Sequence, residues 1–165
     1  MEAPEKPVFK RADHVSLTVS DLDATVRFYV ETMGASLIYR MGPFDAAEIP
    51  AMEDGRDWTD AHVNVKGARL EIAMIKIADN LNMELFAYEK PDDARKDAPR
   101  NCDVGARHVC MEVDDIHKAI AYLSAHGCKA MSGPIVSKDG PCPPSMSWYV
   151  LDPFGIQLEL VEYLN

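Results

Sequence analysis

Hydrophobic and polar residues alternate strictly from His14 to Val19. Alternation with a period of two predicts a strand with one face in a core and its polar side chains on the opposite face. The next segment, 22–33, carries apolar residues at helical spacing. Ser20 is the expected N-cap of this helix and Gly34 its expected end. The chain is therefore expected to begin with a strand that leads directly into a helix.

The same pattern returns in the second half of the chain, from Gly105 to Ile116. Another helix is expected after it, ending at Gly127. A repeat that places a histidine at the same point of two strands suggests a two-fold-related pair of metal ligands. Aligned on those histidines, the identical pairs are His14/His108, Val15/Val109, Val19/Val113 and Asp21/Asp115, and Leu22/Ile116 are equivalent.

Three further strands complete the first half. They are expected at 35–40, at 69–77 and, after a turn, at 82–88. The segment 41–66 contains Gly42-Pro43 and an acidic group, which are typical of turns. The order of elements is then a β-α-β-β-β module.

The second half repeats this order behind a charged segment that contains two prolines and is expected to be an exposed linker. Its last two strands, 147–151 and 156–163, are joined by the turn Asp152-Pro153-Phe154-Gly155. The predicted fold class is therefore α+β, with paired βαβββ modules. The predicted boundaries are a flexible tail at 1–9, a first module at 10–90, a linker at 91–104 and a second module at 105–165, the two modules forming one domain.

A second repeat involves two glutamates, because 83–88 aligns with 158–163. Side chains alternate along a strand, so each glutamate lies on the face opposite its leucine neighbours. If the leucines and valines pack against the helices, the histidines and glutamates face the concave side of the sheet. Such a set of two nitrogens and two oxygens suits zinc, nickel, manganese, iron or cobalt. The predicted metal ligands are His14, Glu84, His108 and Glu159.

Other interpretations of these residues remain. A lone strand histidine is more often a hydrogen-bonded structural residue, and an outward-facing glutamate is more often a solvated carboxylate. The repeat favours the metal site, because all four residues would otherwise recur by chance at matching positions. Glu71 is a weaker candidate for proton transfer. Its side chain lies on the same face of its strand as those of Arg69 and Ala73, and that face could be the concave side of the sheet, but a surface carboxylate fits equally well.

The net charge, the hydropathy and the cysteine content of the chain argue against several classes of function. The 165 residues carry a net charge of −10, which argues against a nucleic-acid partner because phosphate binding needs a basic surface. No apolar run approaches the roughly 18 residues of a membrane span. The N-terminus has no apolar stretch, so we expect no secretion signal. Four cysteines without a CxxC pair indicate reduced thiols and a cytoplasmic protein.

With these motifs in place, the sequence resembles the vicinal oxygen chelate superfamily, the glyoxalase/bleomycin resistance/dioxygenase group. The resemblance covers about residues 10–164, and the closing Asp-Pro-Phe-Gly…Glu pattern is its most specific part. It implies a cupped mixed sheet around one central divalent metal, a small-molecule substrate and often a homodimer. The segments that carry it are Asp13-His14-Val15, Met83-Glu84-Leu85, Arg107-His108-Val109 and residues 152–160.

The branch within this superfamily follows from the ligand set. Glyoxalase I and methylmalonyl-CoA epimerase use four protein ligands, whereas extradiol dioxygenases use two histidines and one glutamate. Glu84 would be the fourth protein ligand, which favours the branch of glyoxalase I and methylmalonyl-CoA epimerase. That branch implies a lyase or isomerase that abstracts a proton next to a carbonyl through a metal-stabilised enediolate, and Glu159 resembles the ligand that doubles as base. The alternatives are an extradiol-type ring-cleaving dioxygenase and a non-catalytic small-molecule binder.

Overall fold

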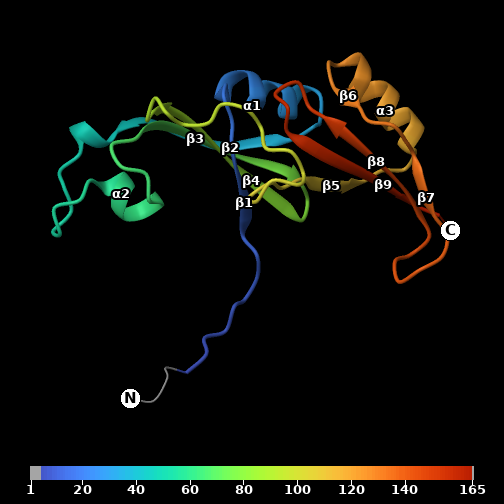
Figure 1. Cartoon of the computed structure of the whole chain (residues 1–165), viewed down its shortest axis with the longest axis horizontal. Helices are drawn as coiled ribbons and strands as arrows, with labels where there is room; N and C mark the ends of the chain where they lie inside the picture. The colour runs from blue at the N-terminus through green and yellow to red at the C-terminus, as the bar shows by residue number, and fades with distance from the viewer. Residues whose placement is uncertain (1–4, 165) are drawn as a thin grey trace. The chain divides into compact units, whose positions relative to one another are not determined.

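A computed structural model describes residues 5–164 (Figure 1). Positions 1–4 of the predicted tail, and position 165, lie outside the described residues. The chain divides into two compact units, which meet in sequence at Asp92 and Asp93. Each unit contains a mixed sheet of its own together with helices. The predicted α+β class with two related modules is confirmed.

The sheet of unit 1 has the strand order β1-β4-β3-β2. β1 and β4 are parallel, and the other neighbours are antiparallel. This is the expected β-α-β-β-β arrangement, in which a helix connects the first two strands. The elements are β1 (His14–Thr18), α1 (Leu22–Glu31), β2 (Ser36–Asp45), the 3-10 turn η1 (Ala46–Glu48), α2 (Trp58–Val63), β3 (Arg69–Ala78) and β4 (Leu81–Lys90).

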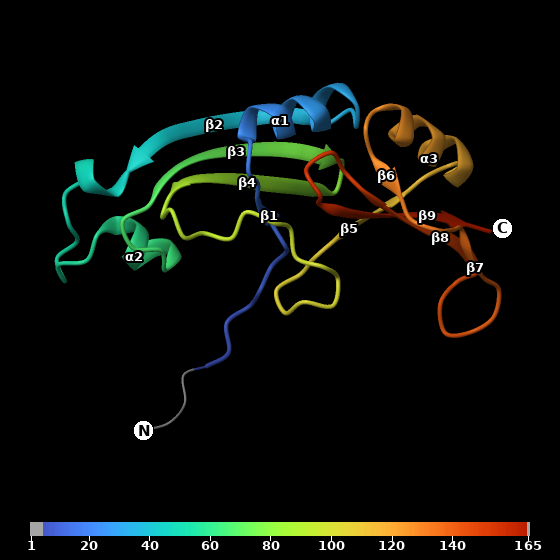
Figure 2. The ribbon, with the colours of Figure 1, turned by 45° about the horizontal axis from the view of Figure 1, so that its top comes forward.

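One face of this sheet packs against α1 (Figure 2). Tyr29 of the helix is fully buried, as are Ile75 and its register partner Met83. The fully buried Leu85 lies two residues further along β4. Because side chains alternate along β4, Glu84 is directed to the face opposite the helix.

β2 continues five residues past its predicted end at residue 40, because Gly42-Pro43 lies inside the strand and not in a turn. The register with β3 shifts between Met41 and Phe44, which is a β-bulge. Gly42 has a φ of +103°, and a Cβ atom there would lie 2.9 Å from the carbonyl oxygen of Leu70. Only glycine fits this bulge, so a residue typical of turns is needed to keep the strand continuous.

The helix α2 lies in the segment that was expected to be turns. Its N-cap is Asp57, whose carboxylate accepts hydrogen bonds from the Thr59 hydroxyl at 2.6 Å, the Asp60 amide at 2.9 Å and the Gly67 amide at 3.0 Å. These donors, led by the Thr59 hydroxyl, lower the pKa of Asp57 to about 2. With six residues, α2 is too short to show a helical period in the sequence.

The repeated aspartates are helix caps. Asp21, not the predicted Ser20, is the N-cap of α1, and its side chain accepts a hydrogen bond from the Ala24 amide at 2.9 Å. Asp115 does the same for the helix of unit 2, accepting from the Lys118 amide at 2.9 Å. The Asp21/Asp115 identity in the repeat therefore has a structural origin in both units.

The sheet of unit 2 has the order β5-β9-β8-β6, and a further strand, β7, also pairs with β8. The short strands β6 and β7 together take the place next to β8 that the long β2 takes next to β3. No helix among the described residues is long and apolar enough to cross a membrane. The elements are β5 (Val109–Glu112), α3 (Ile116–Ala125), β6 (Lys129–Ala130), β7 (Ile135–Ser137), β8 (Ser145–Leu151) and β9 (Gln157–Tyr163).

Candidate metal centre

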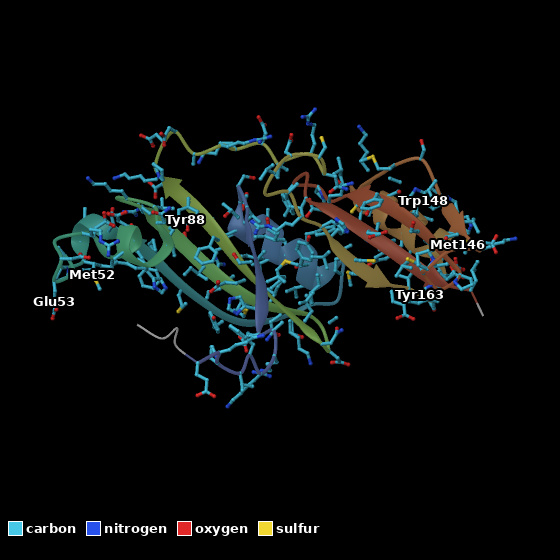
Figure 3. All side chains as sticks on the ribbon, turned by 60° about the horizontal axis from the view of Figure 1, so that its bottom comes forward. Met52, Glu53, Tyr88, Met146, Trp148 and Tyr163 are labelled. Carbon is cyan, nitrogen blue, oxygen red and sulfur yellow. The ribbon has the colours of Figure 1, made fainter. Side chains whose placement is uncertain are left out.

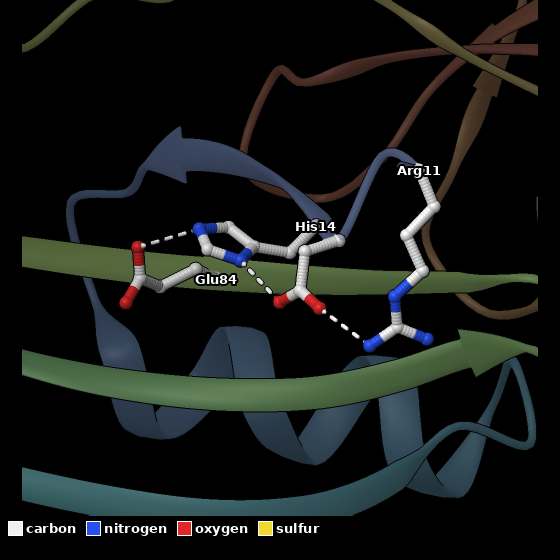
Figure 4. Close-up of polar contacts among 4 residues, drawn as sticks. Arg11, His14 and Glu84 are labelled. Atoms are coloured by element: carbon white, nitrogen blue, oxygen red, sulfur yellow. Dashed lines mark hydrogen bonds and ion pairs between the residues drawn. The ribbon is translucent and has the colours of Figure 1, made fainter. Parts of the chain in front are cut away.

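Unit 1 brings together two of the predicted ligands. His14 begins β1, and Glu84 lies on the parallel neighbour β4. The register partner of Glu84 is Ser16, so the histidine lies two residues before the point of pairing. The Nε2 atom of His14 is 3.5 Å from the Oε2 atom of Glu84 (Figure 4). The glutamate side chain is 17% exposed and the histidine 36%, so the pair is accessible to a ligand.

Unit 2 reproduces this arrangement with the other two predicted ligands. Glu159 on β9 has Cys110 as its register partner on the parallel strand β5, and His108 again lies two residues earlier. The Nε2 atom of His108 is 3.2 Å from the Oε2 atom of Glu159. The side chains are 36% and 20% exposed, close to the values in unit 1. The sequence repeat therefore corresponds to a repeated His–Glu pair at the same register position.

The geometry of each pair suits a shared metal ion. Two protein ligands bound to one ion at about 2.0–2.2 Å lie roughly 3–3.5 Å from each other. The Nε2–Oε2 separations of 3.5 and 3.2 Å lie in this range. Within each unit, the described residues include no third His, Cys, Asp or Glu side chain placed to complete a metal-binding group. Each unit thus presents one His–Glu pair with the spacing of two ligands of one ion.

Two neighbours extend the pair of unit 1 (Figure 4). The Nδ1 atom of His14 is 3.1 Å from Oδ2 of Asp13, and the guanidinium of Arg11 donates to Oδ1 of the same carboxylate at 3.0 Å. The hydrogen bond from His14, followed by the positive charge of Arg11, lowers the pKa of Asp13. An ionised carboxylate only accepts hydrogen bonds, so Nδ1 of His14 is the donor to Asp13. In a neutral imidazole with that proton, Nε2 carries the lone pair and is free to act as a metal ligand.

The pair of unit 2 has different neighbours, which the sequence does not single out. Tyr149 of β8 is the antiparallel register partner of Glu159, and its ring contacts that of His108 edge-on with centroids 5.3 Å apart. Desolvation raises the pKa of Tyr149, and the charge of Glu159 and a hydrogen bond to it raise that pKa further. The same three causes, desolvation first, raise the pKa of the Cys110 thiol to about 11. In unit 1, Met74 occupies the position opposite Glu84.

Glu71 is not brought together with the His14–Glu84 pair of its own unit. Its register partner on β4 is Ala87, whereas Glu84 pairs with Met74. Between these two positions β3 is regular, so Glu71 lies on the sheet face opposite that of Glu84. Its carboxylate is 3.4 Å from the guanidinium of Arg40 and lines a cavity of about 350 Å³ at the start of α1.

Tyr88 of unit 1 and Trp148 of unit 2 have different surroundings. Tyr88 projects from β4 and stacks on Phe86, with ring centroids 5.9 Å apart (Figure 3). Desolvation, followed by the charge of Glu84, raises the pKa of Tyr88, so this ring lies along the Glu84 face. Trp148 instead donates its indole N–H to the Met131 carbonyl at 2.7 Å, which fixes it in the packing of unit 2.

Comparisons with known proteins identify relatives of this chain by sequence. Residues 11–160 match the family described as the Glyoxalase/Bleomycin resistance protein/Dioxygenase superfamily. A 2-epi-5-epi-valiolone epimerase from Actinomyces sp is 35% identical over 151 residues, which are 90% of this chain and 77% of that protein.

Solved structures show the same fold. A glyoxalase family protein from Bacillus cereus has a TM-score of 0.75 at 23% identity, covering 99% of this chain and 100% of that chain. A glyoxalase I mutant from Zea mays has a TM-score of 0.57 at 19% identity, covering 92% of this chain and 44% of that chain. At these identities the similarity concerns the fold alone.

Proposed function

Because this chain belongs to the glyoxalase/bleomycin resistance protein/dioxygenase superfamily, as its sequence predicts, we propose that it is a divalent-metal-dependent epimerase. The observation that carries the proposal is the His–Glu pair found at the same register position in both units. In the proposal, His14, Glu84, His108 and Glu159 hold one ion of zinc, nickel, manganese, iron or cobalt.

The donor set supports this role. Neutral imidazole and carboxylate are ordinary ligands for first-row divalent ions, and both pairs have the spacing that one coordination sphere requires. When bound, such an ion is a Lewis acid that polarises a carbonyl oxygen. The epimerase at 35% identity favours isomerase chemistry over ring cleavage by a dioxygenase.

The protein's own part in the reaction is proton transfer. We assign to Glu159 the removal of the proton from the carbon next to the carbonyl, while the electron pair of that C–H bond moves towards the carbonyl oxygen. Return of a proton to the opposite face of the carbon inverts it, and we assign this step to Glu84, the repeat partner, which delivers a proton that it has taken up from water. Glu159 then releases to water the proton that it removed. Tyr149 and Cys110 beside Glu159 are the protein groups that orient its carboxylate.

The substrate class follows from the relative. We propose a small ketone of the valiolone type, because the 35% identical relative is named for epimerising 2-epi-5-epi-valiolone. Methylglyoxal–glutathione, methylmalonyl-CoA and catechols are the comparison substrates, since they represent the other branches of the superfamily.

The test is solvent exchange. The full chain, loaded separately with each candidate metal, is incubated with 2-epi-5-epi-valiolone in D2O and followed by NMR and mass spectrometry. We expect one deuterium on the carbon beside the carbonyl and the appearance of an epimer. Glu159→Gln should abolish exchange. Glu53→Gln, which changes an exposed loop carboxylate, should leave exchange unchanged (Figure 3).

Three results would contradict the proposal. Binding of the ketone without exchange in any metal form would indicate a non-catalytic binder. Oxygen uptake with catechols in the iron form would indicate a ring-cleaving dioxygenase. Full exchange in Glu159→Gln would remove the assigned base.

A further inference from the structure

We propose that Asp13 is a positioning residue, which holds His14 in the tautomer that presents Nε2 as a metal ligand. The inference rests on the proposed function, because it concerns a ligand of the same site.

The first step is the hydrogen bond itself. Asp13 directly precedes β1, and its Oδ2 atom is 3.1 Å from Nδ1 of His14. Arg11 occupies the other carboxylate oxygen at 3.0 Å (Figure 4). The arginine keeps the carboxylate charged and leaves Oδ2 as an acceptor for the imidazole N–H. In the neutral form of this imidazole, the hydrogen bond therefore places the proton on Nδ1.

The second step follows at the other ring nitrogen. With the proton on Nδ1, Nε2 carries a lone pair and lies 3.5 Å from Oε2 of Glu84, which is also an acceptor. Two acceptors that face each other are stabilised by a cation between them. Carboxylates that hydrogen-bond the second nitrogen of a metal-binding histidine fix its tautomer and increase its basicity as a ligand.

The third step is the contrast with unit 2. Arg107 takes the place before His108 that Asp13 takes before His14. Among the described residues no carboxylate hydrogen-bonds Nδ1 of His108, whose ring instead packs edge-on against Tyr149. The two halves of the repeat thus hold their histidines by different means. Of the two histidines, His14 alone has a carboxylate partner at Nδ1 among residues 5–164. Arg107 provides a matched control position.

Two measurements test the proposal. In the metal-free full chain labelled with 15N-histidine, long-range 1H–15N NMR reports which ring nitrogen of His14 carries the proton. We expect Nδ1 in the wild type and a shift towards Nε2 in Asp13→Ala. In Co²⁺ titrations, Asp13→Ala should bind about 10- to 100-fold more weakly, as for other carboxylate partners of metal-binding histidines. Arg107→Ala should change the affinity less than about 3-fold, and Asp13→Asn, whose amide oxygen still accepts a hydrogen bond, should bind between wild type and Asp13→Ala.

The outcomes separate this inference from the proposed function. An unchanged tautomer in Asp13→Ala, or Co²⁺ affinity equal to that of the wild type, overturns the role of Asp13 even if the protein epimerises ketones. A tautomer shift with weakened Co²⁺ binding supports that role even if no ketone is turned over. A loss in Arg107→Ala as large as that in Asp13→Ala would show that any change beside a histidine weakens the site, and would also overturn the proposal.

Discussion

Asp152 fixes the turn that leads into β9, the strand that carries Glu159. Its side chain is 4% exposed and accepts hydrogen bonds from the amides of Phe154 at 2.9 Å and Ile156 at 2.8 Å. Asp152→Ala leaves these two donors without their acceptor. A buried donor that loses its partner costs about 1–3 kcal/mol, so we expect the free energy of unfolding to fall by about 2–4 kcal/mol, allowing for partial access of water to the turn.

Urea unfolding followed by circular dichroism measures this loss. For a chain of this length, each kcal/mol corresponds to roughly 2–4 °C in melting temperature, so thermal melts give a second readout. Asp152→Asn retains an acceptor oxygen and should lose less. Asp139→Ala, an exposed aspartate in the loop before β8, is the surface control and should lose almost nothing. If Asp152→Ala were no less stable than Asp139→Ala, the turn would not depend on this side chain.

Two further predictions follow from shifted pKa values. The pKa of Cys110 is raised to about 11 against an ordinary 9.0, so its thiolate fraction at pH 8 is roughly 100-fold lower than that of an unshifted thiol. Because a thiolate of higher pKa is more nucleophilic, alkylation should be roughly 10-fold slower, as measured by peptide mapping of the metal-free protein. Glu159→Gln should speed up this alkylation, and an unchanged rate would contradict the contact between Cys110 and Glu159. The pKa of Asp57 is lowered to about 2, so its stabilising contribution is complete above about pH 4 and is lost as the pH falls through 2. The urea midpoints of wild type and Asp57→Ala should therefore differ at pH 6 and converge near pH 2. An equal difference in midpoint at both pH values would refute the lowered pKa of Asp57.

The sequence predicts the two His–Glu pairs because the repeat marks equivalent strand positions, and parallel pairing then places each histidine beside its glutamate. The alternation of side chains along β3 does not show which of its two faces is the one that carries Glu84. The face on which Glu71 lies is therefore known only from the register of β3 with β4. The contacts of Tyr149 with Glu159 and His108 depend on the register of the β8–β9 hairpin, which local patterns do not specify.

Two features of unit 1 depend on contacts between distant residues and differ from what the local sequence predicts. Gly42-Pro43 is typical of a turn, yet pairing with β3 keeps the strand continuous through a bulge. The helix α2 depends on the Asp57 carboxylate and its contact with the distant Gly67 amide, which no short window of sequence contains.

The central claim is that both His–Glu pairs hold a single ion, and the stoichiometry of metal binding tests it most directly. Co²⁺ is titrated by calorimetry into the metal-free full chain, into a double variant His14→Ala/Glu84→Gln and into a double variant His108→Ala/Glu159→Gln. We predict one ion per chain for the wild type and loss of tight binding in both variants. Two ions per chain, or one ion that stays tightly bound when either pair is removed, would contradict the claim.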